Sequence, residues 1–282
     1  MSHHRARATA VTPLRLDAPA KLNLSLRVVG RREDGYHLLE SELVLLDLAD
    51  RLLLLPGCSG LRVEGDAAAV PVDGSNLAWR GLTLGLGGDP DLACLALEKA
   101  IPTAAGLGGG SSDAAAAWRL GRAWTGRSGA ATAEDLRALA GIGADVPFFA
   151  AGVAAATITG IGESIRDAPA LERHVVLVHP PFGLSTAAVF AELRHAEWGQ
   201  LENDLLAPAR RLRPELDDLF ALVVAAGGEP RLTGSGPTVF CLVDDPERAA
   251  SVAGRLARAG ARATITRTRT APTAIETIDE EE

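Results

Sequence analysis

The alternation of apolar and polar residues near the start of the chain predicts its first strand. Residues 14–29 alternate with a period of two, which is the period of a half-buried strand. Lys21, Asn23 and Ser25 then share one face of this strand. That face is either its solvated side or the lining of a cleft, and the small apolar run Ala18-Pro19-Ala20 just before it favours the cleft.

The same reading along the chain predicts alternating strands and helices of ordinary length. Capping residues and glycines set most of the helix ends, as at Thr132 and Gly141. The predicted strands are 38–48, 51–55, 61–63, 92–97, 154–158, 175–179, 239–243 and 263–268, and the predicted helices are 76–86, 112–124, 133–140, 184–193, 246–259 and a helical segment over 203–226.

This pattern predicts an α/β protein of two domains. A composition break at Asp167-Ala168-Pro169 suggests the junction. We therefore expect a flexible N-terminus over residues 1–13, a first domain over 14–167, a second over 168–275 and an acidic tail over 276–282. No internal repeat is evident.

The most informative stretch is PTAAGLGGGSSDAAAA at residues 102–117. Glycine tolerates positive φ, so such a loop can turn several backbone N–H groups toward one anion, and the helix that follows adds its dipole. Ser111, Ser112 and Asp113 are placed to cap that helix. The loop fits neither the P-loop nor the dinucleotide fingerprint, because no lysine follows its last glycine and the glycine spacing is wrong. The alternative is an ordinary flexible turn before an alanine-rich helix.

Lysine is rare in this chain. Only Lys21 and Lys99 stand among 28 basic residues, and the rest are arginine. A chain so biased to arginine can retain lysine where a compact ammonium is needed, although chance survival explains the count equally well. Their positions favour the functional interpretation, because Lys21 lies in the first strand and Lys99 lies three residues before Pro102.

Two shorter stretches carry candidate chemistry. Tyr36 and His37 follow a glycine turn and offer an aromatic face and a hydrogen-bonding edge for a flat group such as a nucleobase, or simply anchor the loop. Asp145 precedes Val-Pro-Phe-Phe, where a carboxylate beside an apolar site could act as a base or hold a cation. The alternative is an aspartate that hydrogen-bonds its own turn.

Composition excludes several other classes. The net charge of −8 argues against nucleic-acid binding, and the longest apolar run, 148–161, is too short to span a bilayer. The N-terminus lacks the apolar segment of a secretory signal. The chain has three cysteines without metal-ligand spacing, Cys58, Cys94 and Cys241. We therefore expect reduced, buried thiols in a cytoplasmic protein, and no metal ion bound by protein side chains.

Five stretches together resemble the GHMP kinases. They are PAKLNL (19–24), GRREDGYH (30–37), IPTAAGLGGGSSDAAAA (101–117), GADVPFF (143–149) and TGSGPTVF (233–240), and they span nearly the whole chain in the order of that family. The first, second and fourth resemble the branch of the family that phosphorylates a cytidine diphosphate-linked methylerythritol in non-mevalonate isoprenoid biosynthesis. No motif position departs from the pattern of that branch.

The resemblance implies a fold, a reaction and a set of site residues. The fold would be an N-terminal domain like domain two of ribosomal protein S5 and a C-terminal ferredoxin-like domain, with the site in the cleft between them. The family's reaction transfers a phosphoryl group from ATP, with Mg²⁺ held mainly by the nucleotide. We expect a monomer or weak homodimer. The implied catalytic residues are Asp145 as base and Lys21 beside it; the implied ATP-binding residues are Asn76, Lys99, Pro102, Thr103, Ala104, Ala105, Gly106, Leu107, Gly108, Gly109, Gly110, Ser111 and Ser112; and the implied substrate-binding residues are Asn23, Tyr36, His37, Thr186 and Phe190, with Tyr36 and Phe190 on either side of the cytosine.

Two other functions remain open at this point. Another GHMP kinase acting on homoserine, mevalonate or a sugar would not need an aromatic clamp for a base. A nucleotide-binding sensor without catalysis would not need Lys21 and Asp145, and both are present.

Overall fold

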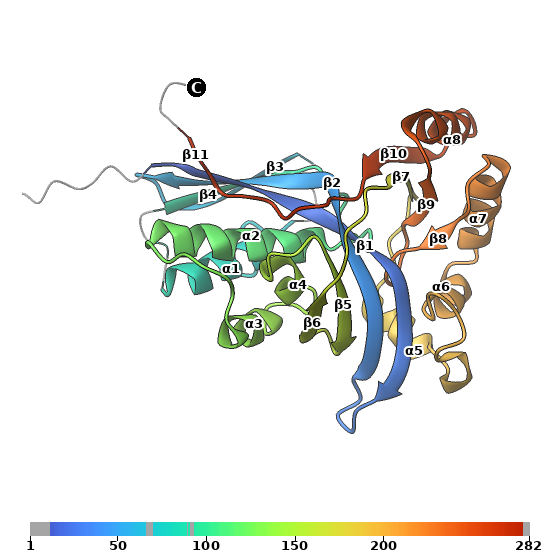
Figure 1. The fold of residues 1–282 in the computed structure, drawn as a ribbon, viewed down its shortest axis with the longest axis horizontal. Coiled ribbons are helices and arrows are strands. Elements are labelled where there is room, and N and C mark those ends of the chain that lie inside the picture. Colours follow the sequence, from blue (N-terminus) through green and yellow to red (C-terminus); the bar gives the residue numbers. More distant parts are fainter. Residues whose placement is uncertain (1–11, 66–69, 89, 91–92, 279–282) are drawn as a thin grey trace, which may run out of the picture.

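Two α/β units lie side by side and share the long first hairpin (Figure 1). The structure, a computed structural model, describes residues 12–65, 70–88, 90 and 93–278. Residues 1–11 of the predicted flexible N-terminus and residues 279–282 of the predicted acidic tail therefore lie outside the described residues. Among the residues that are described, no helix combines the length and apolar character needed to cross a membrane.

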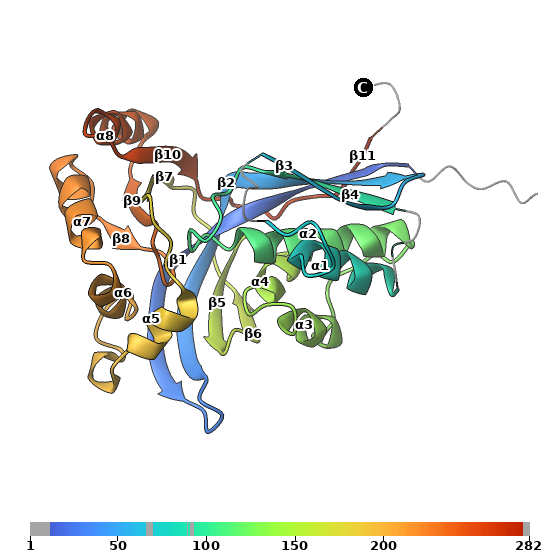
Figure 2. The same cartoon turned by 180° about the vertical axis from the view of Figure 1, so that it is seen from behind.

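The first unit is a mixed sheet covered by helices on one face (Figure 2). Its strands run in the order β11-β1-β2-β4-β3, and β5 pairs with β2 and β6. The elements are β1 (Leu14–Arg31), β2 (His37–Pro56), β3 (Gly60–Gly65), α1 (Leu77–Leu86), β4 (Ala93–Lys99), α2 (Gly109–Trp124), α3 (Ala133–Ala140), α4 (Val146–Ala150), β5 (Ala155–Gly160), β6 (Ser164–Asp167) and, from the other end of the chain, β11 (Glu276–Thr277).

The second unit is an antiparallel sheet in the order β10-β7-β9-β8. Figure 1 shows α6, α7 and α8 on the side away from the first unit, whereas α5 lies near the long hairpin. The elements are β7 (His174–His179), α5 (Thr186–Glu192), the 3-10 turn η1 (His195–Glu197), α6 (Leu206–Leu212), α7 (Glu215–Ala225), β8 (Arg231–Leu232), β9 (Val239–Val243), α8 (Pro246–Arg258) and β10 (Arg262–Arg267).

Strand β7 shows how the sequence pattern joins the two units. Its residues are apolar in succession, so both faces of the strand are buried. Val176 and Val178 pack in the core under the helices of the second unit. Val175 and Leu177 pack on the other side against Leu22 and neighbours from the first sheet. One continuous apolar layer therefore joins the two units.

Most predicted elements are present, and three differences are informative. The two strands predicted at 38–48 and 51–55 form one strand, β2. The short α4 and the strand β6 were not predicted. After β10 the chain returns to the first sheet, where Thr268 bridges to Leu46 and β11 pairs with β1, so this stretch lies on the first unit although it follows the second in sequence.

The start of α2 was predicted wrongly. The helix begins at Gly109, three residues before the predicted start, and its N-cap is Gly108, which has φ +73° and no side chain to accept a hydrogen bond. Ser111, Ser112 and Asp113 therefore lie inside the helix and do not cap it. Glycine has a poor helix propensity, so propensity alone predicts no glycine in or beside the first turn, where three are found. As a consequence, no side-chain cap occupies the N–H groups at this helix end.

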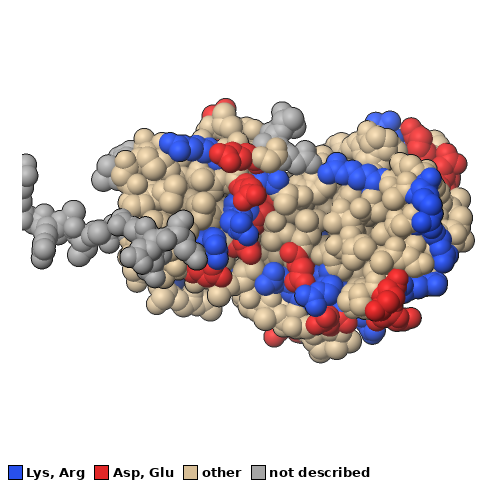
Figure 3. Space-filling model, turned by 90° about the horizontal axis from the view of Figure 1, so that it is seen from above, with Lys and Arg blue, Asp and Glu red and all other residues tan. Residues whose placement is uncertain are grey.

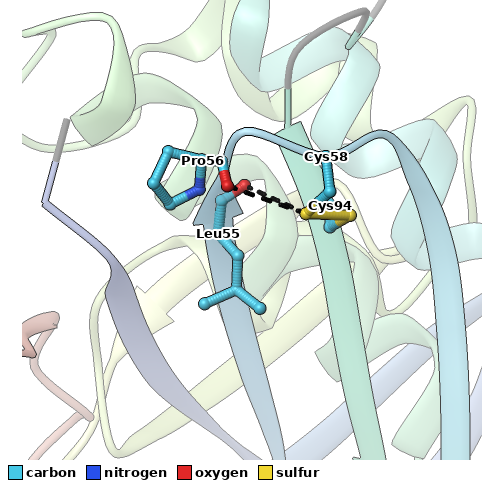
Figure 4. Close-up of a disulfide and its surroundings, with 4 residues drawn as sticks. All are labelled: Leu55, Pro56, Cys58 and Cys94. Carbon is cyan, nitrogen blue, oxygen red and sulfur yellow. Dashed lines mark hydrogen bonds between the residues drawn. A yellow bond between two sulfur atoms is a disulfide. The ribbon is translucent and has the colours of Figure 1, made fainter. Parts of the chain in front are cut away.

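The prediction of three reduced cysteines was wrong for two of them. Cys58 and Cys94 form a disulfide with a Cα–Cα distance of 5.3 Å, beside Leu55 and Pro56 (Figure 4). Cys241 is free and buried, as expected. The parallel pairing of β3 with β4 sets Gly60 opposite Cys94 and so brings the turn with Cys58 alongside. A separation of 36 residues gives no sign of this in the sequence.

Charged side chains of both signs are interspersed on the face seen from above (Figure 3). The ion pairs of Arg267 with Asp47 and with Glu172 are examples of such mixing at the surface of the described chain. All of these groups are exposed, so each pair adds little to stability.

Candidate active site

The glycine loop connects the end of β4 to the start of α2 and lines a cavity of about 520 Å³. Two of its glycines allow contacts that a side chain would block. A Cβ on Gly106 would lie 2.7 Å from the Gly236 carbonyl oxygen, and one on Gly108 would lie 3.0 Å from Lys21 Cγ. Both residues also have positive φ. The loop therefore packs between a second glycine turn, residues 233–237, and β1, the strand that carries Lys21.

Every residue predicted to bind ATP except Ser112 lines this cavity. Asn76 is also the N-cap of α1, where its Oδ1 accepts from the Ala78 N–H at 2.8 Å and its Nδ2 donates to the Pro71 carbonyl at 2.6 Å. Ser112 is buried, and its hydroxyl has no hydrogen-bond partner among the described residues. The loop, the uncapped start of α2 and this cavity have the composition of an anion site for a phosphate chain.

Lys21 and Asp145 meet in a second cavity, of about 330 Å³, on the other side of the loop. Lys21 Nζ lies 3.6 Å from Asp145 Oδ2 and donates to Asn23 Oδ1 at 2.5 Å. Asn23 Nδ2 in turn donates to Ser41 Oγ at 2.8 Å, which fixes the amide. The predicted polar face of the first strand is therefore confirmed as the lining of a cleft for Lys21 and Asn23.

The Asp145 carboxylate is free of its own turn. It is the N-cap residue of α4, yet its side chain makes no capping hydrogen bond. It is 42% exposed, whereas the Lys21 side chain is only 5% exposed. The alternative reading of Asp145 as a turn-forming residue is therefore not supported. A half-exposed carboxylate fixed by a buried ammonium can accept a proton from a group in the cavity.

The two cavities meet at the glycine loop. Gly106, Gly108, Ser111 and Thr186 line both of them. A phosphate at the end of a chain held in the first cavity would therefore face a hydroxyl held in the second. Ser235 also lines the second cavity, and its hydroxyl lies 2.9 Å from Thr186 Oγ1. Sequence analysis did not select Ser235, although the second glycine turn that carries it was the available signal.

The predicted base clamp is only partly assembled. His37 stacks on Phe190 with ring centroids 5.4 Å apart, and Trp198 meets His37 edge-on at 5.6 Å. Burial lowers the pKa of His37, and nearby Arg31 adds to this effect. Phe190 lines the second cavity. Tyr36 is 63% exposed at the tip of the hairpin and is not among the residues that line either cavity. Sequence analysis did not select Trp198.

Lys99 is held by two buried aspartates, of which sequence analysis did not select Asp50 and named Asp113 only as a helix cap. Its Nζ donates to Asp50 Oδ2 and, at 2.6 Å, to Asp113 Oδ2. Burial lowers the pKa of Lys99, but the carboxylates of Asp113 and Asp50 raise it above its ordinary value overall. Burial raises the pKa of Asp113 to about 8, Lys99 opposes that rise and Asp50 adds to it. Asp113 therefore keeps its proton to a higher pH than an exposed aspartate does.

No group of three or more His, Cys, Asp or Glu side chains in the described part of the chain is arranged to hold a metal ion.

Comparisons with known proteins agree with this geometry. The model of the GHMP kinase N-terminal domain matches residues 76–153, and that of the GHMP kinase C-terminal domain matches residues 186–262. A 4-diphosphocytidyl-2-C-methyl-D-erythritol kinase of Dinoroseobacter shibae is 39% identical over 279 residues, covering 89% of this chain and 92% of the relative. One of Paracoccus denitrificans is 39% identical over 263 residues, covering 85% and 90%.

A solved structure leads to the same family. The crystal structure of a 4-(cytidine 5'-diphospho)-2C-methyl-D-erythritol kinase superposes with a TM-score of 0.76 and 35% identity, covering 90% of this chain and 98% of that one. The two-domain fold expected from the sequence is thereby confirmed. With this identity over nearly the full length, the chain belongs to the 4-diphosphocytidyl-2-C-methyl-D-erythritol kinases, a family of ATP-dependent GHMP kinases.

Proposed function

We propose that this chain transfers the γ-phosphoryl group of ATP to the 2-hydroxyl of 4-diphosphocytidyl-2-C-methyl-D-erythritol, in the non-mevalonate route to isoprenoid precursors. The observation that carries the proposal is the contact of Lys21 with Asp145 at 3.6 Å, in the cavity that adjoins the glycine loop. The names of the relatives support this acceptor, because these proteins share more than a third of their residues with this chain.

Asp145 is proposed to act as the general base. Its carboxylate takes the proton of the acceptor hydroxyl while that oxygen attacks the γ-phosphorus, and the bond from the γ-phosphorus to the β,γ-bridging oxygen breaks to release ADP. Lys21 orients the carboxylate and offsets negative charge on the transferred group. Phosphoryl transfer gains most of its acceleration from positioning and charge stabilisation, so one base and one ammonium suffice beside a preformed phosphate loop.

The phosphates of ATP are proposed to lie along the loop from Pro102 to Ser112. Several observations support this: the positive φ of Gly106 and Gly108, the start of α2 without a side-chain cap, and the unpartnered Ser112 hydroxyl. Asn76 and Lys99 are proposed to lie toward the adenosine side of the same cavity. Bound Mg²⁺ would neutralise phosphate charge, and we propose that the nucleotide holds most of its coordination.

The cytosine is proposed to bind at the aromatic end of the second cavity, between Phe190 and Tyr36, with His37 reading its edge. In the structure His37 lies on the Phe190 ring, so entry of a base requires His37 to leave that face. The exposed Tyr36 at the hairpin tip is free to close over the base. Asn23 and Thr186 are proposed to contact the remainder of the substrate.

The test is ADP release by the purified protein with Mg-ATP and a panel of alcohols. The panel holds the cytidylylated methylerythritol, methylerythritol phosphate without cytidine, homoserine, mevalonate and galactose. We expect release with the cytidylylated compound alone. Release with another alcohol contradicts the proposed acceptor, and ATP binding without release on any member contradicts the proposed catalysis.

A further inference from the structure

The buried cluster of Lys99, Asp50 and Asp113 joins three elements at the edge of the nucleotide cavity. Asp50 comes from β2, Lys99 is the last residue of β4 and Asp113 lies in the second turn of α2. The three side chains are 0%, 3% and 4% exposed. Lys99 and Asp113 line the cavity, and Asp50 lies behind them.

Asp50 also binds the backbone where the glycine loop begins. Its Oδ1 accepts the N–H of Ala100 at 2.6 Å and the N–H of Ile101 at 2.8 Å. Its Oδ2 accepts from Lys99 Nζ. A single carboxylate thus fixes three consecutive residues immediately before Pro102.

Lys99 connects Asp50 to the other end of the loop, at the start of α2. Its Nζ donates to Asp113 at 2.6 Å and lies 3.4 Å from the position that a Cβ on Gly109 would occupy. Gly109 is the first residue of α2. The cluster therefore sets the spacing between the end of β4 and the start of α2, which are the two ends of the loop.

Stability alone is a poor explanation for such a cluster. Removing three ionisable groups from water costs several kcal/mol for each charge, and their mutual attraction repays this only partly. Asp113 Oδ1 even remains buried without a hydrogen-bond partner among the described residues. A requirement for fixed geometry at the loop accounts for both features.

We propose that Asp50 is a positioning residue for the nucleotide phosphates, which acts through Lys99 and through the N–H groups of residues 100 and 101. It holds the two ends of the glycine loop at the separation at which the loop N–H groups converge on the phosphate chain. In this arrangement Asp50 and Asp113 hold the Lys99 ammonium at the edge of the cavity. The inference depends on the proposed function, in that the loop must hold the phosphates of ATP.

The experiment compares the affinities of Mg-ADP and AMP for wild type, Asp50→Ala and Asp50→Asn by titration calorimetry. Misplacement of a binding group by about 1 Å can cost about 100-fold, so we expect Asp50→Ala to lose up to about 100-fold in ADP affinity. Because AMP lacks the β-phosphate, its affinity should change far less. Asp50→Asn keeps an oxygen for the two N–H groups but turns an amide NH2 toward Lys99 in place of the charged oxygen that accepts from it. Its ADP affinity should therefore fall by about 10-fold, the lower end of the range for indirect supports of a site.

Asp17→Asn is the matched control. Asp17 lies on the neighbouring strand, where it pairs with Arg51, the residue after Asp50, but its side chain is 45% exposed. We expect its ADP and AMP affinities to equal those of wild type. Asp50→Asn is nearly isosteric and decides the question where Asp50→Ala does not fold.

Two outcomes overturn the inference while leaving the proposed function intact. One is that the ADP and AMP affinities of Asp50→Asn both equal those of wild type. The other is an equal loss for both nucleotides in the Asp50 variants, which would mean that the cluster supports the adenosine side or the fold in general. If wild type itself gains no affinity from the β-phosphate, the assignment of the loop to the phosphates fails first.

Discussion

The two lysines of this chain occupy surroundings of opposite character. Both side chains are almost fully buried, at 5% exposed for Lys21 and 3% for Lys99. Lys21 faces a half-exposed aspartate across 3.6 Å in a cavity. Lys99 is closed in by two aspartates that are themselves buried. Burial of the lysine therefore does not distinguish the two sites; exposure of its partner does.

This difference separates a group that can act on a substrate from one that acts within the fold. The Asp145 carboxylate, at 42% exposed, can accept a proton from a molecule in the cavity, and Lys21 can follow the charge that develops. The partners of Lys99 face the protein interior, where Asp50 accepts from Lys99 and from backbone N–H groups and Asp113 accepts from Lys99. We expect variants at the first site to change turnover and variants at the second to change stability and loop geometry.

The largest effect is expected for Asp145→Asn. The amide cannot accept the proton, and general base catalysis contributes about 100- to 10,000-fold, so kcat should fall by about 1,000-fold or more. Nucleotide affinity should stay within about three-fold, because Asp145 lies in the second cavity and not in the first. Steady-state ADP release and ADP titration measure the two quantities. Asp167→Asn, at an exposed site on β6, is the control, and turnover by Asp145→Asn near that of wild type would remove Asp145 from the role.

The next effect is on stability, for Lys99→Met. This variant leaves two buried carboxyl groups without their cation, and breaking a buried pair in this way costs about 3–5 kcal/mol in the free energy of unfolding. Urea denaturation measures it. The control is Arg51→Met, at the residue after Asp50. The exposed ion pairs that Arg51 forms with Asp17 and Glu98 each contribute less than about 1 kcal/mol. Equal losses for the two variants would contradict the closed character of the Lys99 site.

Lys21→Met should lower kcat by about 100-fold, the size of effect seen when one charge-stabilising donor is removed. The loss in the free energy of unfolding should be smaller than for Lys99→Met, because the partner carboxylate of Lys21 is half exposed to water. In the double variant with Asp145→Asn the two losses in kcat should not multiply, since both groups act on the same step. Full multiplication would show that Lys21 and Asp145 act independently.

The sequence predicted the open site, formed by Lys21 and Asp145, better than the closed site, formed by Lys99, Asp50 and Asp113. The glycine loop and Asp145 belong to distinctive local stretches, and the rarity of lysine drew attention to Lys21 and Lys99. The loop and Asp145 can be found in the sequence for a physical reason. A loop that binds an anion needs glycine, and Asp145 stands directly before a run of apolar residues. The family resemblance then supplied what spacing alone does not, namely that Lys21 and Asp145 lie together.

The closed site depends on pairings between distant strands, which no local pattern records. Asp50 stands in a strand between apolar runs and reads as an ordinary polar position, although it is fully buried. Its contact with Lys99 follows from the pairing of Arg51 with Glu98, which sets the register of β2 against β4. The same strand neighbourhood places Cys58 beside Cys94. Asp113 was taken for a helix cap, because the glycines before it disguise the true start of α2.

The smallest expected effect is the change in the free energy of unfolding for each pH unit that Asp113 contributes in the closed site. Burial raises the pKa of Asp113 from 3.8 to about 8, so between these values the folded chain holds a proton that the unfolded chain has released. This contribution to the free energy of unfolding is complete at low pH and declines as the pH rises toward 8, by up to about 1.4 kcal/mol for each pH unit. In Asp113→Asn it is absent, so the stability of wild type relative to this variant should decline as the pH rises. Urea unfolding at a series of pH values measures the difference.

Asp135→Asn is the control of opposite sign. Hydrogen bonds from Thr132 and the charge of Arg122 lower the pKa of Asp135 in spite of partial burial. The contribution of Asp135 to the free energy of unfolding is therefore lost only as the pH falls below the ordinary pKa of an aspartate. A difference between wild type and Asp113→Asn that stays constant with pH would mean that water reaches Asp113, and the Lys99 site would then be as open as that of Lys21.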